Sequence, residues 1–175
     1  LGSYYLTIIM PNEPGEGKVF RSFEEALLAY HSGVVGLHAP IKVRVEKEID
    51  GKKISRIIDC TIGRIIFNEP IPQDLGYVDR TDEEHMLDLE IAFLVGKKEL
   101  GKIIEKCIAV HGTSVTAEVL DKIKAQGYKY STKGAITVSV SDAVIPPQKK
   151  ELIAEAERKI EDISKKFRRG LLSEE

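Results

Sequence analysis

Cysteine is scarce in this 175-residue sequence, and no long apolar run occurs in it. Cys60 and Cys107 are too far apart for the CxxC spacing of metal and redox sites, and each lies within an apolar pattern. We interpret both as reduced core residues of a cytoplasmic protein. No run approaches the roughly 18 apolar residues of a membrane span, and no charged-then-apolar leader opens the chain, so we expect no membrane partner.

A strong net charge of either sign is absent as well. Charged residues make up 31% of the chain, but the formal net charge is only -2. No global field therefore draws the protein to nucleic acid, and any contact with DNA or RNA must be local or provided by a partner. The 42% hydrophobic content is enough to bury a core, which predicts one domain or one domain with an appendage.

Motifs for catalysis are also missing. The glycines match no phosphate-binding loop, and no serine or cysteine has a recognisable nucleophile context. Residues 82–85, an acidic run ending in His85, offer metal-ligand types, but adjacent side chains in a loop point in different directions, so we interpret the run as a solvated loop. His38 and His111 stand beside apolar residues and are interpreted as structural. We therefore predict no catalytic residue and no metal ligand.

A helix start and a hairpin are the clearest local patterns of the first half. In the capping box of Ser22 and Glu25, the Ser22 hydroxyl is expected to accept from the amide three residues on, and Glu25 to reach back to the Ser22 amide. The helix is predicted to run through Tyr30 and to stop at Gly33.

Alternating apolar and charged residues at 41–46 then predict a half-buried strand. Asp50 and Gly51 suit a tight turn, and residues 52–60 supply the returning arm of a β-hairpin. Residues 61–67 are predicted to extend the sheet.

The second half is mainly helical in its patterning. Residues 68–90 lack a period and predict an irregular connection. Two consecutive helices, ending at Gly112 and Gly127, form a predicted helical hairpin that packs on the sheet. Alternation at 136–141 predicts a further strand before the Pro146-Pro147 break.

One uninterrupted helical pattern covers residues 148–169. Its apolar residues form a narrow seam with charge on either side, as in one limb of a coiled coil; they are Leu152, Ala156, Ile160, Ile163 and Phe167. At about 1.5 Å per residue, the helix would be on the order of 33 Å long, so we expect it to project. Gly170 would make a turn, and Ser173 is a natural N-cap for a returning helix.

These elements predict an α+β fold, in which a mixed sheet with a β-hairpin and a helical hairpin is followed by a long C-terminal helix. The predicted domains are residues 1–145 and residues 146–175.

The sequence resembles the β′ subunit of bacterial RNA polymerase in seven collinear blocks. Among them are Leu37-His38-Ala39-Pro40 and Thr61-Ile62-Gly63-Arg64. The blocks are residues 1–7, 15–20, 25–30, 37–44, 61–69, 134–137 with Asp142 and Pro146-Pro147, and 155–157 with 167–172. The resemblance implies a β′ fragment, in which residues 1–145 form the pore or secondary-channel domain and residues 146–175 begin the funnel, or rim, coiled coil.

The resemblance also implies a function within a nucleotidyltransferase, DNA-directed RNA polymerase. The secondary channel admits nucleoside triphosphates and releases a backtracked RNA 3′ end, and transcript-cleavage and other regulatory factors dock on the rim. The implied partners are the rest of β′ and the other polymerase subunits, with DNA and RNA bound only in the assembled enzyme. The Mg and Zn of the family subunit are expected to bind elsewhere, because the aspartate-rich magnesium motif is absent here; the isolated fragment is predicted to be inactive.

The resemblance singles out two sets of candidate site residues. Lys133 and Asp142 flank a strand that faces the channel in the family. The candidates for factor docking are Lys165, Lys166, Phe167, Arg168, Arg169, Gly170, Leu171, Ser173 and Glu174. A local interpretation of the basic residues is open too, because cations stabilise the C-terminal end of a helix by about 0.3–1 kcal/mol.

Some relatives bind a guanosine alarmone near the second helix of the helical hairpin. The matching positions are Ser114, Glu118, Asp121 and Ala125, of which only Asp121 keeps the expected residue type. This departure argues against alarmone binding here.

Two other functions compete with a polymerase segment. The chain could be an independent interaction module that recruits a partner through its long helix, or a small-molecule-binding α+β enzyme. In an independent module, the apolar seam of the long helix should be covered by another helix. In an enzyme, polar groups should converge on a pocket.

Overall fold

The computed structural model describes residues 1–49 and 52–171. By its internal contacts the chain divides into two compact units, Leu1–Ile136 and Thr137–Glu175, and each is described by itself. The assignment of residues 1–145 and 146–175 to functional domains stays a prediction. In the described residues, no helix combines the length and the apolar content needed to cross a bilayer.

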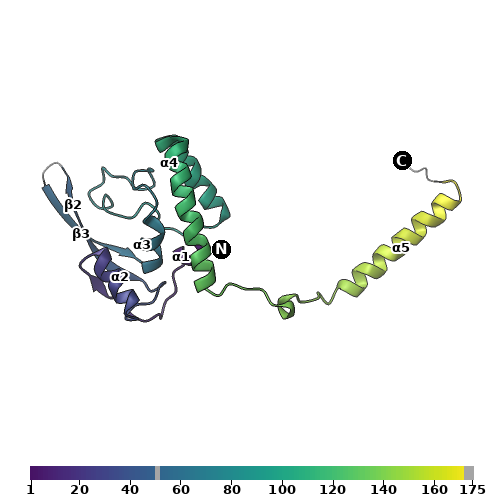
Figure 1. Cartoon of the computed structure of the whole chain (residues 1–175). Helices are drawn as coiled ribbons and strands as arrows, with labels where there is room; N and C mark the ends of the chain where they lie inside the picture. The colour runs from purple at the N-terminus through teal and green to yellow at the C-terminus, as the bar shows by residue number, and fades with distance from the viewer. Residues whose placement is uncertain (50–51, 172–175) are drawn as a thin grey trace. The chain divides into compact units, whose positions relative to one another are not determined.

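A three-stranded mixed sheet forms one side of the first unit (Figure 1). β1 (Val19–Phe20) pairs in parallel with β2 (Ile41–Ile49), and β2 pairs antiparallel with β3 (Lys52–Cys60). Ile41 and Val43 are buried whereas Lys42 and Arg44 are exposed, as the alternation predicts. The β-hairpin is therefore confirmed, although its predicted turn at residues 50–51 lies outside the described residues; the two-residue β1 was not predicted.

The predicted capping box starts α2 (Phe23–His31). The Glu25 amide donates to the Ser22 hydroxyl at 3.2 Å, as expected. The Glu25 carboxylate, however, accepts from the amide of Arg21 at 2.6 Å rather than from that of Ser22. Gly33 follows the helix with a φ of 72°, a conformation that suits glycine.

The prediction that residues 61–67 extend the sheet is wrong, because this segment forms α3 (Ile62–Asn68). The Thr61 hydroxyl caps the helix by accepting from the Arg64 amide at 3.2 Å. The helix is buried on nearly every side, so its sequence is an apolar run with no helical period. Such a run does not distinguish a buried strand from a buried helix.

Close backbone packing joins α3 to α1 (Gly2–Thr7), a short helix that was not predicted. A Cβ on Gly63 would lie 2.1 Å from the Leu6 carbonyl oxygen, so only glycine allows this approach. The Thr7 hydroxyl accepts from the buried amide of Val95 at 2.8 Å. α1 thus ties α3 to the chain segment that leads into the next helix.

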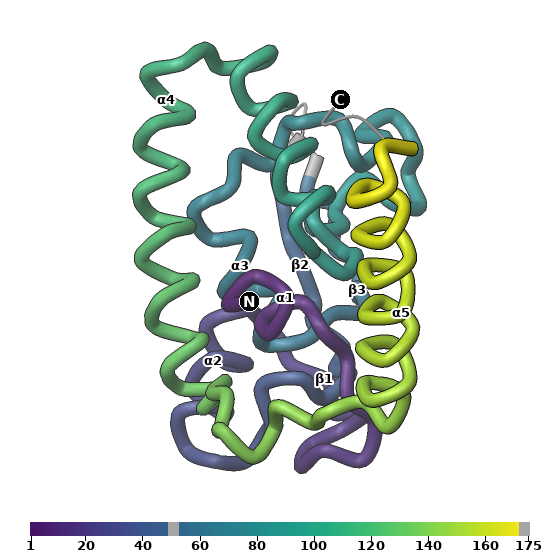
Figure 2. The backbone as a smooth tube through the Cα atoms, turned by 90° about the vertical axis from the view of Figure 1, so that its right-hand side faces the viewer, coloured from purple at the N-terminus to yellow at the C-terminus, as the bar shows by residue number. Residues whose placement is uncertain are grey.

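α4 (Lys97–Lys133) consists of two helical limbs that meet at Gly112, where φ is 76° and ψ is 178° (Figure 2). The helical hairpin and its turn at Gly112 are confirmed. The predicted stop at Gly127 is wrong, because the second limb continues to Gly134. The glycine that allows α1 to approach here is Gly2, because a Cβ on Gly2 would lie 2.2 Å from the Gly127 carbonyl oxygen, whereas a Cβ on Gly127 would meet no atom within 4 Å. α4 packs mainly on α1, so α1 and α3 intervene between it and the sheet.

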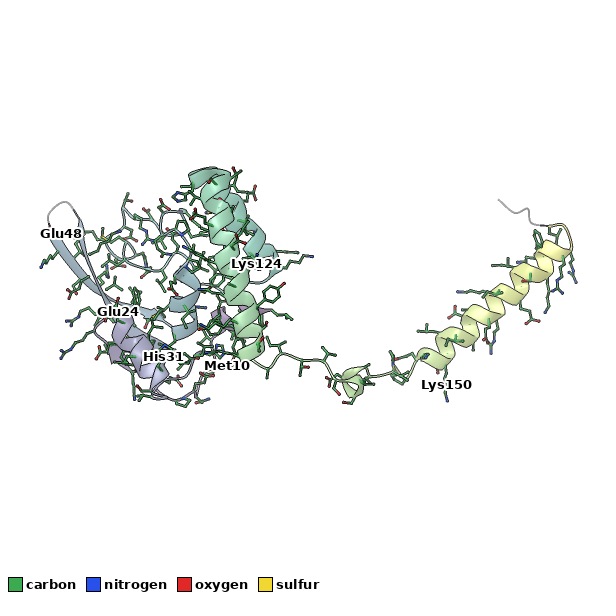
Figure 3. The ribbon with its side chains drawn as sticks, viewed as in Figure 1. Met10, Glu24, His31, Glu48, Lys124 and Lys150 are labelled. Atoms are coloured by element: carbon green, nitrogen blue, oxygen red, sulfur yellow. The ribbon has the colours of Figure 1, made fainter. Side chains whose placement is uncertain are left out.

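The second unit contains a short 3₁₀ turn and α5. The strand predicted at residues 136–141 is wrong: Val140–Asp142 forms the 3₁₀ turn η1, and Val138 and Val140 are 85% and 93% exposed. Alternating residues form a strand only where a neighbouring strand supplies hydrogen bonds, and none of the described strands pairs with these residues. The long helix is confirmed as α5 (Lys149–Arg168), with Lys150 in its first turn (Figure 3).

The close approach of α3 to α1 gives a test of the packing. We expect Gly63→Ala to lower the free energy of unfolding by about 1–3 kcal/mol, because the added methyl group displaces the α1 backbone. Gly101→Ala is the matched control, since its Cβ would meet no atom within 4 Å and alanine favours a helix interior by up to about 1 kcal/mol. Urea denaturation followed by circular dichroism measures both; an equal effect of the two substitutions would contradict the packing.

Candidate functional site

A buried ion pair organises the irregular segment between α3 and α4. The Glu90 carboxylate is fully buried, and its Oε1 lies 3.1 Å from the Arg80 guanidinium. Glu90 Oε2 accepts from the Tyr77 amide at 2.8 Å. Arg80 also donates to the carbonyl oxygens of Met86, Asp88 and Gln73 at 2.7, 2.8 and 3.1 Å. One guanidinium thus holds three separate stretches of the loop, an arrangement called here the Arg80–Glu90 clasp.

Side-chain amides connect this clasp to α3. Asn68 donates to the Ile91 carbonyl and accepts from the Ile91 amide, both at 2.9 Å. The Gln73 side chain accepts from the Glu90 amide at 3.0 Å and donates to Asn68 Oδ1 at 3.2 Å. These hydrogen bonds pair the Ile91 amide and carbonyl and the Glu90 amide inside the unit. Buried backbone N–H and C=O groups need such partners.

A cavity of about 420 Å³ lies between α2, β2, α3 and this loop. Phe23, Leu27 and Ile65 supply apolar walls, and Asn68, Gln73 and Arg80 supply polar ones. The volume is within the usual range for ligand pockets. Asn68, Gln73 and Arg80 are engaged in the clasp and its connections to α3, whereas Glu24, Lys47 and Glu69 also line the cavity and take no part in the clasp. None of the lining residues is a histidine, cysteine or serine, so the cavity offers no imidazole or thiol group.

The predicted channel residues lie in different units. Lys133 is exposed in the last turn of α4, and its ammonium group lies 5.5 Å from the centre of the Tyr130 ring. Asp142 belongs to η1, where its carboxylate accepts from the Ser139 amide at 2.7 Å. Both side chains are exposed and could meet an anion or a cation in solvent, and their role at a channel stays a prediction.

The described docking candidates gather at the end of α5. Lys165 and Lys166 pair with Glu161 and Asp162 at 2.8 and 2.7 Å. Phe167, at the end of the apolar seam, is 47% exposed. Gly170 has a φ of 70°, and the Leu171 amide donates to the Lys166 carbonyl at 3.0 Å, so the chain turns there. Ser173 and Glu174 lie outside the described residues.

The histidines and cysteines lie in different surroundings, and neither ring nitrogen of His38 has a hydrogen-bond partner among the described residues. His38 is buried, its ring packs edge-on against Tyr5 at 4.6 Å, and burial lowers its pKa. His111 Nε2 lies 2.6 Å from Asp74 Oδ1. Cys60 and Cys107 are buried free thiols, and burial raises the pKa of Cys60 to about 12. Such a thiol is almost fully protonated near neutral pH and is a poor nucleophile.

No group of three or more histidine, cysteine, aspartate or glutamate side chains is placed to hold a metal ion in residues 1–49 and 52–171. His85 instead pairs with Asp88 at 2.9 Å, and that carboxylate raises the pKa of His85. The expectation that the family's magnesium and zinc bind elsewhere stays a prediction.

The four positions that match the alarmone site are exposed on the second limb of α4. Asp121, which keeps the expected residue type, pairs with Lys124 at 2.8 Å.

Sequence reasoning missed the Arg80–Glu90 clasp. The two residues stand ten positions apart in a segment without periodicity, and many such pairs are simply solvated. The only usable signal was the length of the aperiodic segment, since long structureless loops within a compact domain are unusual.

Comparisons with known proteins identify relatives along the whole chain. Residues 1–143 match the family model described as RNA polymerase Rpb1, domain 3. The chain is 59% identical over all 175 residues to the DNA-directed RNA polymerase subunit beta' of Acetivibrio thermocellus. It is 58% identical over the same length to the corresponding subunits of Clostridium acetobutylicum and Thermoanaerobacter pseudethanolicus. In each case the match covers 100% of this chain and 15% of the relative.

Removing one partner of the clasp should destabilise the first unit strongly. We expect Arg80→Met to lower the free energy of unfolding by about 3–5 kcal/mol, because it leaves the Glu90 carboxylate buried without a counterion. Lys42→Met is the control: it breaks the exposed pair with Asp59, whose side chains are 53% and 82% exposed, and should cost no more than about 1 kcal/mol. Thermal and urea denaturation measure the difference; equal losses would show that the clasp is no stronger than a surface pair.

Proposed function

This chain belongs to the RNA polymerase Rpb1 domain 3 family, and we propose that it acts as the segment of a β′ subunit that shapes the secondary channel and presents a docking helix. The predicted resemblance to bacterial β′ is confirmed by the relatives described above. The chain spans about 15% of the length of those relatives, so polymerase activity is proposed only for a complete subunit in its assembly.

The observation that carries the proposal is the extent of the similarity. At 59% identity, the match to a β′ subunit includes all 175 residues, and so it extends past the family model into α5. This full-length match favours a polymerase segment over an independent interaction module and over a small-molecule enzyme. The helix is then one part of a larger subunit.

The first unit suits a structural role in a wall. Its long irregular loop is held by the buried Arg80–Glu90 clasp and by Asn68, so its surface keeps a fixed shape without regular secondary structure. A channel needs such a surface, because its width decides which molecules pass. The chemistry of RNA synthesis would be supplied by magnesium bound in other parts of the enzyme, and the isolated chain would be inactive.

The second unit suits a docking role. In α5 the apolar seam of Leu152, Ala156, Ile160, Ile163 and Phe167, spaced four, four, three and four residues apart, is typical of one limb of a coiled coil. Ile160 and Ile163 are 63% and 55% exposed, so the seam is available for a second helix. The basic residues at its end would face a regulatory factor. Partners would include the rest of β′, the other polymerase subunits and transcript-cleavage factors, in the cytoplasm.

Charge reversal tests the docking role. In an assembled polymerase that carries this segment, we expect Lys165→Glu with Lys166→Glu to reduce factor-stimulated cleavage of a backtracked transcript by roughly tenfold or more, because the two lysines that the proposal places against the factor are reversed in charge. Lys149→Glu with Lys150→Glu reverses two lysines at the other end of α5 and should leave cleavage near wild type. Basal elongation is measured in parallel; an equal loss in both variants would contradict docking at this end.

The channel role predicts an effect on substrate affinity. We expect Lys133→Ala to raise KM for nucleoside triphosphates by about two- to tenfold with little change in kcat, because a channel lysine raises the local substrate concentration without touching the reacting atoms. Lys129→Ala is the matched control, since both ammonium groups lie near the Tyr130 ring, at 5.6 and 5.5 Å. Single-nucleotide addition kinetics distinguish the two; an unchanged KM for Lys133→Ala would remove Lys133 from the channel.

A further inference from the structure

His38 is a buried ionisable group whose ring the fold leaves without hydrogen bonds. The residue is only 3% exposed, and neither Nδ1 nor Nε2 has a partner among the described residues. Its ring packs edge-on against the Tyr5 ring of α1, with 4.6 Å between the two centroids. A neutral imidazole tolerates such a site better than an imidazolium, because the charged ring has two N–H donors and loses its hydration on burial.

The backbone of His38 holds an exposed segment of the chain. Residues 8–17 contain no helix or strand, and most of them are exposed. The Met10 amide donates to the His38 carbonyl at 3.1 Å, and the His38 amide donates to the Glu13 carboxylate at 3.0 Å. Residues 8–17 are therefore fastened at the residue whose ring is buried against α1.

The groups around the ring oppose one another in their effect on its charge. The Glu13 carboxylate and the Ile8 carbonyl favour the charged ring, but burial outweighs both and lowers the pKa of His38 below its ordinary value of 6.5. Burial also raises the pKa of Tyr5, on which Tyr30 of α2 acts as well, so Tyr5 is a neutral neighbour near pH 7.

We propose that His38 is an acid-sensitive switch: its neutral ring holds residues 8–17 against α1, and uptake of a proton from solvent expels the ring and releases this segment. The imidazolium needs an acceptor for each of its two N–H groups, and water supplies both once the segment opens. The switch depends on neither the channel role nor the docking role proposed above.

The switch works in a defined pH range. The open state binds the proton with a pKa near 6.5, and the closed state binds it with a lower pKa. Closing is therefore fully favoured above about pH 6.5. Each pH unit below that value weakens closing by up to about tenfold, until the pH falls through the pKa of the closed state.

Hydrogen exchange in the full 175-residue chain tests the switch. Met10 and Gly17 are the reporters, because their amides donate to the carbonyls of His38 and Pro40. We expect their protection, corrected for the intrinsic exchange rate, to fall about tenfold between pH 7.5 and 5.0. In His38→Phe, which keeps a ring but binds no proton, the change should be smaller than about twofold.

A matched control separates His38 from the other histidines. His31→Phe removes an exposed imidazole at the end of α2 and should lose protection at pH 5.0 as wild type does. His38→Gln is a second neutral substitution for the case that phenylalanine does not fit the site. An NMR titration of the wild-type ring requires no substitution, and the His38 signal should change below about pH 6.5.

Three results would overturn the proposal. The first is an equal loss of protection in wild type and in the neutral variants of His38. The second is unchanged protection of Met10 and Gly17 in wild type down to pH 5.0. The third is a His38 ring that gains its proton while Met10 stays protected, and this wild-type result decides the case even if neither variant folds.

Discussion

The Arg80–Glu90 clasp is the interaction on which the first unit most depends. A fully buried carboxylate without a counterion would strongly destabilise the fold. If the loop moved, the three carbonyl oxygens that accept from Arg80 would also lose their donor. The observed arrangement of the loop between α3 and α4 pairs the Glu90 carboxylate and three loop carbonyl groups with one guanidinium, although Arg80 Nε is buried without a partner. The clasp replaces the main-chain ladder of a helix or a sheet as the source of order.

Glycine backbones give the helical part of the unit its close packing. Gly63 allows α3 to contact Leu6, and Gly2 contacts the backbone of Gly127 in α4. Three helices are thus stacked through backbone contacts, with no side chain between them at these points. The Thr7 hydroxyl, which accepts from the Val95 amide, ties the end of the loop to the same stack, so the clasp and the helix packing support one another.

Local chemistry made part of the fold predictable. The α2 cap, the β-hairpin, the turn at Gly112 and the length of α5 all depend on residues that are neighbours in sequence, and each was predicted. α3 was missed because a helix buried on all sides loses its period, and the strand at 136–141 was wrong because alternation needs a partner strand that these residues lack. Gly127 was wrong as a stop because α4 continues through it to Lys133. The spacing of α5 predicted its exposed seam, whereas the docking candidates came from the resemblance and stay a prediction. The clasp joins residues across an aperiodic loop and could not be predicted.

The outer half of the β-hairpin has a consequence for how such sequences can diverge. Glu46, Lys47, Glu48, Lys53 and Ser55 are all exposed, and Glu48 lies near the far end of the hairpin (Figure 3). Little of the core depends on these arms, and doubling the length of a flexible connection costs only about 0.6 kcal/mol in closure entropy. Evolution can therefore lengthen, shorten or recharge this hairpin in different lineages while the body beneath it stays folded.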